Sequence, residues 1–210
     1  QNGNQVVAQK LNVVTNWLDE GNFDTGWYNE ALPVFEISEP AQLAGLANLV
    51  NQGHKFIDKT IILKNNINMS GHIWTPIGIG KLNRNPNTFC GTFDGNHKII
   101  SNITTLETEN TQGLFGDNKG IIKNIIIINS DIRGLNVVGG IAAHNRGKIQ
   151  NSANLCSVRG TEVVGGVVGS NSGEITQSYN KGQVAGKQKV GGIAGSNSGQ
   201  NAKIINVYNI

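Results

Sequence analysis

A glycine-rich block recurs three times in the C-terminal half of the chain, starting every 26 residues at Val138, Val164 and Val190. The copies read VGGIAAHNRG, VGGVVGSNSG and VGGIAGSNSG. A fixed period of this length indicates a solenoid, in which each repeat buries its apolar face only by stacking on its neighbours. It is too short for a strand–helix–strand unit, which needs about 30 residues or more. The period therefore predicts an all-β parallel β-helix of about five to six coils, each with three short strands.

Aligning these copies with a fainter one at Gly113 places similar residues in columns, with repeats at 113–139, 140–165, 166–191 and 192–210. One column is apolar, a second holds only very small side chains, and a third is asparagine. The residues assigned structural roles in these repeats are Gly113, Leu114, Gly116, Asn118, Gly140, Ile141, Asn145, Gly166, Val167, Gly169, Asn171, Gly192, Ile193, Gly195 and Asn197. Further apolar columns are expected at Ile122, Ile149, Ile175 and Ile204, and at Ile132, Val158 and Val184.

The asparagine column has two interpretations. Identical amides stacked one strand spacing apart can hydrogen-bond along the axis as a ladder, and asparagine also tolerates a left-handed corner. Alternatively, the column is a polar binding strip on the outside of the solenoid. The ladder predicts that each asparagine contributes to stability, whereas the strip predicts a contribution to binding.

The N-terminal region, residues 1–55, is expected to cap the first coil of a β-helix that spans 56–210. Apolar residues at helical spacing predict a helix over about 39–52, with Ser38 as its N-cap and Gly53 as its stop. Residues 5–18 also have helical spacing, although their paired valines suit a strand. Trp27, Tyr28 and Trp74 are expected to pack the cap onto the first coils, with sugar stacking as the alternative.

Composition fits many tight corners, since the chain has 28 Gly and 30 Asn. The net charge of +3 and the scattered Lys and Arg give no footprint for nucleic-acid binding. No apolar run reaches the length of a membrane span. Cysteine and histidine spacings predict no metal site, and no cofactor is expected. A chain that starts at Gln1 without Met is expected to have lost a targeting segment.

No catalytic constellation is evident, because the four histidines do not form HExxH and no nucleophile motif is present. Asp94 and Asp117 occupy related positions in successive coils, so they are candidates to meet as an acid pair or to bind a cation. The alternative is local hydrogen bonding within turns. His144 is expected to be exposed, because serine takes its place in later copies. The speculative binding residues are Asp94, Asp117, His144, Arg146 and Arg159, together with the loop 81–88.

The repeat resembles the GLUG motif of bacterial proteins. GLFG at 113–116, its later forms GGIA, GVVG and GIAG, the upstream WTPIG at 74–78 and FDGN at 93–96 carry this resemblance, which covers about residues 27–210. It implies a secreted or cell-surface protein, similar to adhesin-like proteins of gut Bacteroidetes or to non-catalytic regions of IgA-specific metallopeptidases. The resemblance supplies no catalytic residues.

The sequence therefore favours a non-enzymatic extracellular or cell-surface β-helix that acts as a rigid scaffold or adhesion module. Its expected partner is a host or cell-surface glycan or protein. The alternatives are a carbohydrate-active β-helix enzyme and a non-catalytic N-terminal module of a larger surface enzyme. The last strand ends near Ile210, and an uncapped coil exposes a sheet edge. The expectation at this end is a continuing chain or end-to-end packing on another copy.

Overall fold

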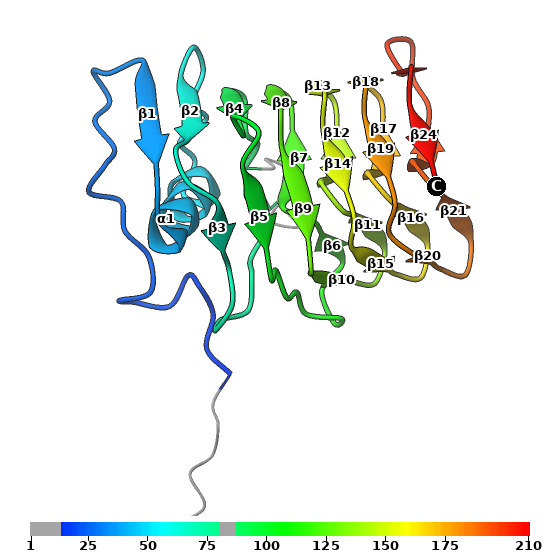
Figure 1. The fold of residues 1–210 in the computed structure, drawn as a ribbon, viewed down its shortest axis with the longest axis horizontal. Helices are drawn as coiled ribbons and strands as arrows, with labels where there is room; N and C mark the ends of the chain where they lie inside the picture. Colours follow the sequence, from blue (N-terminus) through cyan, green and yellow to red (C-terminus); the bar gives the residue numbers. More distant parts are fainter. Residues whose placement is uncertain (1–13, 80–86) are drawn as a thin grey trace, which may run out of the picture.

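The computed structural model describes residues 14–79 and 87–210, which form a parallel β-solenoid of about six turns. The coils stack in order along the long axis, and a single helix lies beside the first strands (Figure 1). Every strand pair in the described part of the chain is parallel and joins residues about one coil apart. The predicted all-β parallel β-helix is therefore confirmed.

Five sheets run along the solenoid. The longest contains β1 (Val34–Ile37), β2 (Thr60–Leu63), β4 (Thr92–Asp94), β8 (Ile121–Lys123), β13 (Lys148–Gln150), β18 (Glu174–Thr176) and β23 (Lys203–Ile205). A second contains β3 (Ile67–Asn68), β5 (Ile99–Ser101), β9 (Ile126–Ile128), β14 (Ala153–Asn154), β19 (Tyr179–Asn180) and β24 (Tyr208–Asn209).

The other three sheets belong to the repeat region. One contains β7 (Phe115–Asn118), β12 (Ala142–Asn145), β17 (Val168–Asn171) and β22 (Ala194–Asn197). Another contains β6 (Thr111–Gln112), β11 (Val137–Gly139), β16 (Val163–Gly165) and β21 (Lys189–Gly191). The smallest contains β10 (Asp131–Arg133), β15 (Ser157–Arg159) and β20 (Val184–Ala185).

A complete coil thus has five strands, so the expectation of three was wrong. The coil that begins at β12 continues through β13, β14, β15 and β16 before β17 stacks on β12. Strands of two to four residues are possible because the chain turns so often, at glycines and at residues with positive φ. The left-handed corners are held by Asn124 (φ 57°), Asn151 (φ 46°), Gln177 (φ 49°) and Asn206 (φ 52°), which are not members of the asparagine column found in the sequence.

The core is a set of apolar columns that continue from coil to coil. The in-register column that includes Ile122 and Ile149 extends in both directions, and its members are Phe35, Ile61, Phe93, Ile122, Ile149, Ile175 and Ile204. Burying one such side chain contributes about 1.5–3 kcal/mol. A smaller side core of Ile132, Val138, Val158 and Val164 packs separately. Both predicted apolar columns are confirmed.

The helix α1 (Pro40–Asn51) covers the start of the core with Leu43, Leu46 and Val50, all at most 1% exposed. It begins one residue later than predicted, because Glu39 and not Ser38 is the N-cap. Proline at the first helical position needs no N–H partner, and the Gln42 side chain accepts hydrogen bonds from the Ser38 and Glu39 amides. The predicted stop is confirmed, since Gly53 follows the C-cap Gln52 with φ 109°.

The N-terminal segment is tied to the solenoid by strand pairing and aromatic packing. β1 pairs with β2, so the longest sheet starts within the predicted cap. Trp27 and Tyr28 pack on Phe35, each with ring centroids 5.4 Å apart, and Trp74 is buried. The expected packing role of these aromatic residues is therefore confirmed.

The predicted helix over residues 5–18 lies mainly outside the described residues. Residues 14–18, which are described, are not helical; Asn16 instead forms a parallel bridge with Ile73.

Candidate functional site

The asparagine column is a hydrogen-bonded ladder inside the solenoid. The Nδ2 of Asn118 donates to Oδ1 of Asn145 at 2.8 Å, Asn145 donates to Asn171 at 2.8 Å, and Asn171 donates to Asn197 at 2.7 Å. The first three side chains are fully buried. The ladder interpretation is confirmed, and the three buried amides are not available as an external binding strip, whereas Asn197 is exposed at the last coil.

A second ladder was missed by the sequence analysis. Asn154 donates to Asn180 at 2.8 Å, and Asn180 donates to Asn209 at 2.7 Å. Asn154 and Asn180 are 26 residues apart, as the repeat requires, whereas Asn209 follows after 29 residues. Ile127 occupies the aligned position in the coil before Asn154, and the insertion before Lys203 shifts the last rung, so the asparagines do not recur in every copy.

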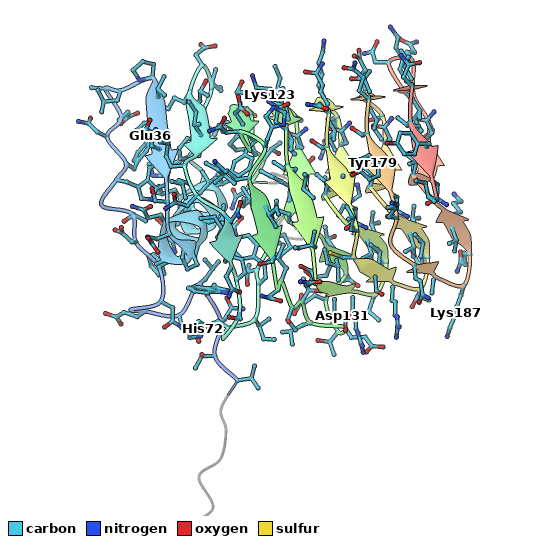
Figure 2. The ribbon with its side chains drawn as sticks, in the orientation of Figure 1. Glu36, His72, Lys123, Asp131, Tyr179 and Lys187 are labelled. Atoms are coloured by element: carbon cyan, nitrogen blue, oxygen red, sulfur yellow. The ribbon has the colours of Figure 1, made fainter. Side chains whose placement is uncertain are left out.

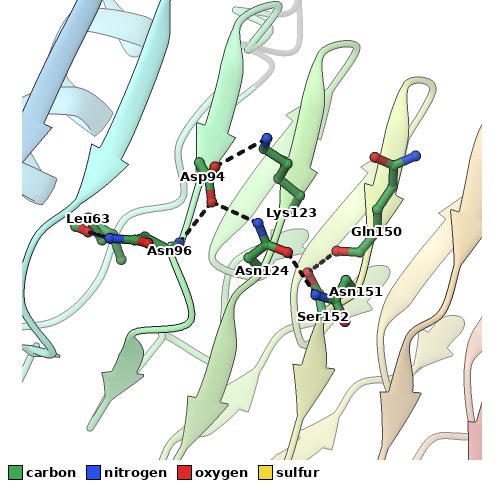
Figure 3. A network of polar contacts seen from close by, with 8 residues as sticks. All are labelled: Leu63, Asp94, Asn96, Lys123, Asn124, Gln150, Asn151 and Ser152. Atoms are coloured by element: carbon green, nitrogen blue, oxygen red, sulfur yellow. Dashed lines mark hydrogen bonds and ion pairs between the residues drawn. The ribbon is translucent and has the colours of Figure 1, made fainter.

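Asp94 has a structural role at a corner (Figure 3). Its carboxylate accepts hydrogen bonds from the Asn96 amide at 2.8 Å and from Asn124 Nδ2 at 2.9 Å, and it pairs with Lys123 at 3.1 Å. Asn151 in turn donates to Asn124 at 2.8 Å, which extends the chain of contacts by one coil. Burial alone raises the pKa of Asp94, but these hydrogen bonds and the lysine outweigh it and lower the pKa.

The candidate pairing of Asp94 with Asp117 does not occur, and the alternative of local hydrogen bonding in a turn is confirmed for Asp94. Asp94 ends β4 in the longest sheet and is aligned with Lys123, whereas Asp117 lies in β7 of a different sheet and is aligned with His144. Each carboxylate has its own cationic partner, Lys123 for the first and Arg146 for the second. They therefore do not form an acid pair or a shared cation site.

Asp117 is a buried carboxylate held by two neighbours. It is 2% exposed, and Arg146 Nε donates to its Oδ1 at 3.1 Å while Arg146 Nη2 binds Oδ2. The Thr88 hydroxyl also donates to Oδ2, at 3.0 Å. This ion pair links two successive coils.

His144 is half-buried, so its expected exposure was wrong. It lies between Asp117 and Ser170 in the parallel register, and the neighbouring side chains cover part of the ring. Burial lowers the pKa of His144, and Arg146 lowers it further, whereas the Asp117 charge acts in the opposite direction. The imidazole is thus stabilised in its neutral form.

Asp117, His144 and Ser170 therefore follow one another in a single column, in an order that suggests an acid, a base and a nucleophile. Nucleophilic catalysis needs hydrogen bonds from serine to histidine and from histidine to the acid. Within the described residues, His144 makes neither contact, and Arg146 and Thr88 engage both oxygens of Asp117. The column therefore lacks the hydrogen bonds of a catalytic unit, and its buried carboxylate is engaged by Arg146 and Thr88.

A groove of about 700 Å³ runs along one corner of the solenoid, from the first coils into the repeat region. One wall carries Cys90, Lys119 and Arg146, which precede the corner in successive coils. The other wall carries the residues that open the strands of the longest sheet, namely Thr60, Thr92, Ile121, Lys148, Glu174 and Lys203. Of the speculative residues, Arg146 lines this groove, whereas Arg159 is exposed on β15 and does not.

Glycine forms the floor of the groove, at positions 91, 120, 147 and 173. A Cβ at Gly147 would lie 2.1 Å from the Gly120 carbonyl oxygen, and one at Gly173 would lie 2.1 Å from the Gly147 carbonyl oxygen. Only glycine permits this approach of successive coils. The same requirement keeps the floor free of side chains.

The groove has an excess of positive charge. It is lined by five cationic residues, Lys59, Lys119, Arg146, Lys148 and Lys203, and by two carboxylates, Asp58 and Glu174. Lys59 donates to the Leu32 carbonyl at 3.0 Å, and Arg146 is paired with Asp117. Lys119, Lys148 and Lys203 are exposed and form no ion pair within the described part of the chain. These three ammonium groups are therefore free to bind an anion.

Comparison with known proteins gives one informative match. No protein-family model matches the chain, and the search of curated proteins gives no match. A crystal structure from Bacteroides ovatus, of a protein named as a candidate immunoglobulin A1 protease, aligns with a TM-score of 0.60 and 19% identity. The alignment covers 90% of this chain and 70% of that protein. At this identity the similarity establishes the β-solenoid fold and nothing more.

Three other properties of the described residues bear on the site. No helix among them is long and apolar enough to span a membrane. No group of three or more His, Cys, Asp and Glu side chains within residues 14–79 and 87–210 is arranged to hold a metal ion. Cys90 and Cys156 are both free thiols.

Proposed function

We propose that this chain is a non-enzymatic, rigid β-solenoid module of a secreted or cell-surface bacterial protein, which serves as a scaffold or adhesion surface. The observation that carries the proposal is the asparagine ladder from Asn118 to Asn197. Its hydrogen bonds use the most regular polar residues of the repeat for internal support. The residues that recur in the repeat therefore stabilise the solenoid, and the residues that differ between copies lie on its surface.

The proposal includes membership of the GLUG-repeat group and an extracellular location. The motif at 113–116 and its later forms support the first, and the source organism and printed name of the solved structure of similar fold support the second. Because that solved structure is named as a protease, the main alternative is that this chain is a non-catalytic module of a larger surface enzyme. In either case the repeats hold the module rigid and present the groove.

A carbohydrate-active enzyme is less well supported. Glycoside hydrolysis uses two carboxyl groups about 5–9.5 Å apart that face one substrate. Asp94 and Asp117 were the best candidates, and each is held by its own cation in a separate sheet. Glu174 lines the groove on β18, next to its last strand, and Asp58 lines its other end just before β2, and these two strands are four positions apart in the longest sheet.

Two measurements on the folded, purified chain test this function. The first is incubation with immunoglobulin A1 and with a panel of polysaccharides, followed by analysis for cleaved products. We expect none. Cleavage that is lost in both Asp117→Asn and His144→Gln would contradict the non-enzymatic function. The second is attachment of chain-coated beads to host epithelial cells and to bacterial cells, which distinguishes an adhesion surface from a purely mechanical spacer.

A further inference from the structure

We propose that the glycine-floored groove binds an extended acidic polysaccharide, whose carboxylate or sulfate groups contact Lys119, Lys148 and Lys203. This inference rests on the proposed adhesion function and specifies its ligand. It starts from three free ammonium groups that face one hollow of about 700 Å³. A cleft lined mainly by one sign of charge raises the local concentration of oppositely charged ligands.

The length of the groove favours an extended ligand. Six residues in parallel register line one wall, from Thr60 on β2 to Lys203 on β23. Neighbouring strands are about 4.8 Å apart, so the five intervals span about 24 Å. A small metabolite would occupy only a fraction of this length. A linear polymer can lie along the axis of the solenoid and contact every coil.

The charges are spaced for a polymer that bears anionic groups at intervals. Lys148 and Lys203 are two strands apart, or about 10 Å, and Glu174 lies between them in register. Lys119 extends from the opposite wall, at the corner that precedes β8. An anionic chain on the glycine floor therefore contacts cations on both sides. Between Lys148 and Lys203, the Glu174 carboxylate is available as a hydrogen-bond acceptor.

The neutral contacts favour a sugar polymer over an acidic peptide. The Glu174 carboxylate accepts hydrogen bonds from hydroxyl groups, and Thr60 and Thr92 also line the wall. An acidic peptide has few hydroxyl donors and would be repelled by Glu174. A polysaccharide with charged groups separated by hydroxyl-bearing positions satisfies both kinds of contact.

The floor also lacks what a peptide uses to bind. The Gly120, Gly147 and Gly173 carbonyls already accept hydrogen bonds from the amides of Lys148, Glu174 and Lys203, at 2.8–2.9 Å. No backbone ladder is therefore left for an added strand, which is the usual source of affinity for an extended peptide. The lining also includes no aromatic side chain and no apolar pocket for peptide side chains.

The experiment is a binding titration of the purified chain with four polymers of similar length. Heparin carries sulfates, polygalacturonate carries carboxylates, dextran is neutral, and polyglutamate is an acidic peptide. The groove variant is Lys119→Gln, Lys148→Gln and Lys203→Gln combined. The control variant is Lys181→Gln, Lys187→Gln and Lys189→Gln combined, which removes the same charge from exposed lysines outside the groove. Figure 2 shows Lys187 at the opposite edge of the solenoid from Lys123, whose strand β8 contributes to the groove.

We expect heparin or polygalacturonate to bind, with an affinity that falls as salt is added because the contacts are ionic. The groove variant should bind about 100-fold more weakly, on the order of five-fold for each lysine, while the control variant should lose less than about three-fold. Dextran should not bind, and polyglutamate should bind more weakly than the acidic polysaccharides. Thermal midpoints of both variants should match that of the parent chain, because the substituted lysines are exposed.

Three results would overturn the inference. Equal losses in the two variants would mean unspecific attraction to a basic protein. Tighter binding of polyglutamate would make the ligand an acidic peptide. Failure of both heparin and polygalacturonate to bind would exclude acidic polysaccharides as the ligand. None of these results would change the cleavage and bead-attachment measurements, so a failed ligand assignment remains distinguishable from a failed scaffold or adhesion function.

Discussion

Arg146 reaches back one coil to bind the buried carboxylate of Asp117 through both Nε and Nη2. The Asp117 side chain is 3% exposed, whereas the arginine side chain is 41% exposed, so water reaches one partner and not the other. This geometry makes Asp117 depend on its neighbours, since a carboxylate taken out of water needs a compensating charge or hydrogen bonds. The pair also joins β7 to the corner after β12.

Replacing Arg146 with Ala should therefore destabilise the solenoid. We expect a loss of about 2–3 kcal/mol in the free energy of unfolding, below the range for fully buried pairs because the arginine is half exposed. Asp117→Asn in the same background should recover part of the loss, since a neutral amide costs less to bury. Urea denaturation of the two single variants and the double variant measures this coupling. Additive losses would show that the two residues do not stabilise each other.

Gly147→Ala should be among the most destabilising single changes in the chain. Its Cβ would lie 2.1 Å from the Gly120 carbonyl oxygen, so the coils must separate, at a cost of about 3 kcal/mol or more. Gly71→Ala is the matched control, because nothing lies within 4 Å of its Cβ position and only its φ of 103° is unfavourable. That conformation costs about 1–2 kcal/mol. Equal thermal shifts for the two variants would contradict the steric role of the groove floor.

His144 should make the stability of the chain depend on pH. Its folded pKa is lowered by burial, so the unfolded state binds a proton more readily than the folded state. The contribution of neutral His144 to the free energy of unfolding is fully present above the unfolded pKa of about 6.5. It is lost as pH falls through the folded pKa. His144→Gln should remove this part of the pH dependence. The measurement is the free energy of unfolding of both proteins from about pH 7.5 down to about pH 5. Parallel pH curves would exclude this role of His144.

The fold was predictable because the apolar columns repeat at a fixed interval. Ile122, Ile149 and Ile175 pair in the register that the alignment predicts, and Ile204 rejoins them after the insertion. Tyr179 and Tyr208 pair in the same parallel register, and their rings lie 5.0 Å apart with an interplanar angle of 2°. Residues one period apart stack on each other because each coil buries the apolar face of the next.

Other features depend on geometry that a repeat does not encode. The number of strands in a coil depends on every position at which the chain turns, and the left-handed corner at Asn124 and Asn151 is only one of them. The prediction that Asp94 and Asp117 take related positions was wrong. The sequence near the two aspartates is similar, but it does not show that they lie in different sheets.

The groove was not predicted as a site, because its cations sit at positions that change from copy to copy. Lys148 is aligned with Ile121 in one neighbouring coil and with Glu174 in the other. Lys119 and Arg146 correspond in successive copies, and of the two only Arg146 was predicted as a speculative binding residue. Their convergence on one hollow becomes evident when the corners are stacked.

The central claim is that the recurring asparagines support the solenoid, and that binding lies elsewhere on it. The most direct measurement is chemical denaturation of Asn118→Ala, Asn145→Ala, Asn171→Ala and Asn197→Ala, with polysaccharide binding measured on each folded variant. We predict losses of about 2–3 kcal/mol at the three buried rungs, where an amide partner is left unpaired, and less than about 1 kcal/mol at the exposed end rung Asn197. Binding by the folded fraction should be unchanged. Unchanged stability in all four variants, with weakened binding, would contradict the account.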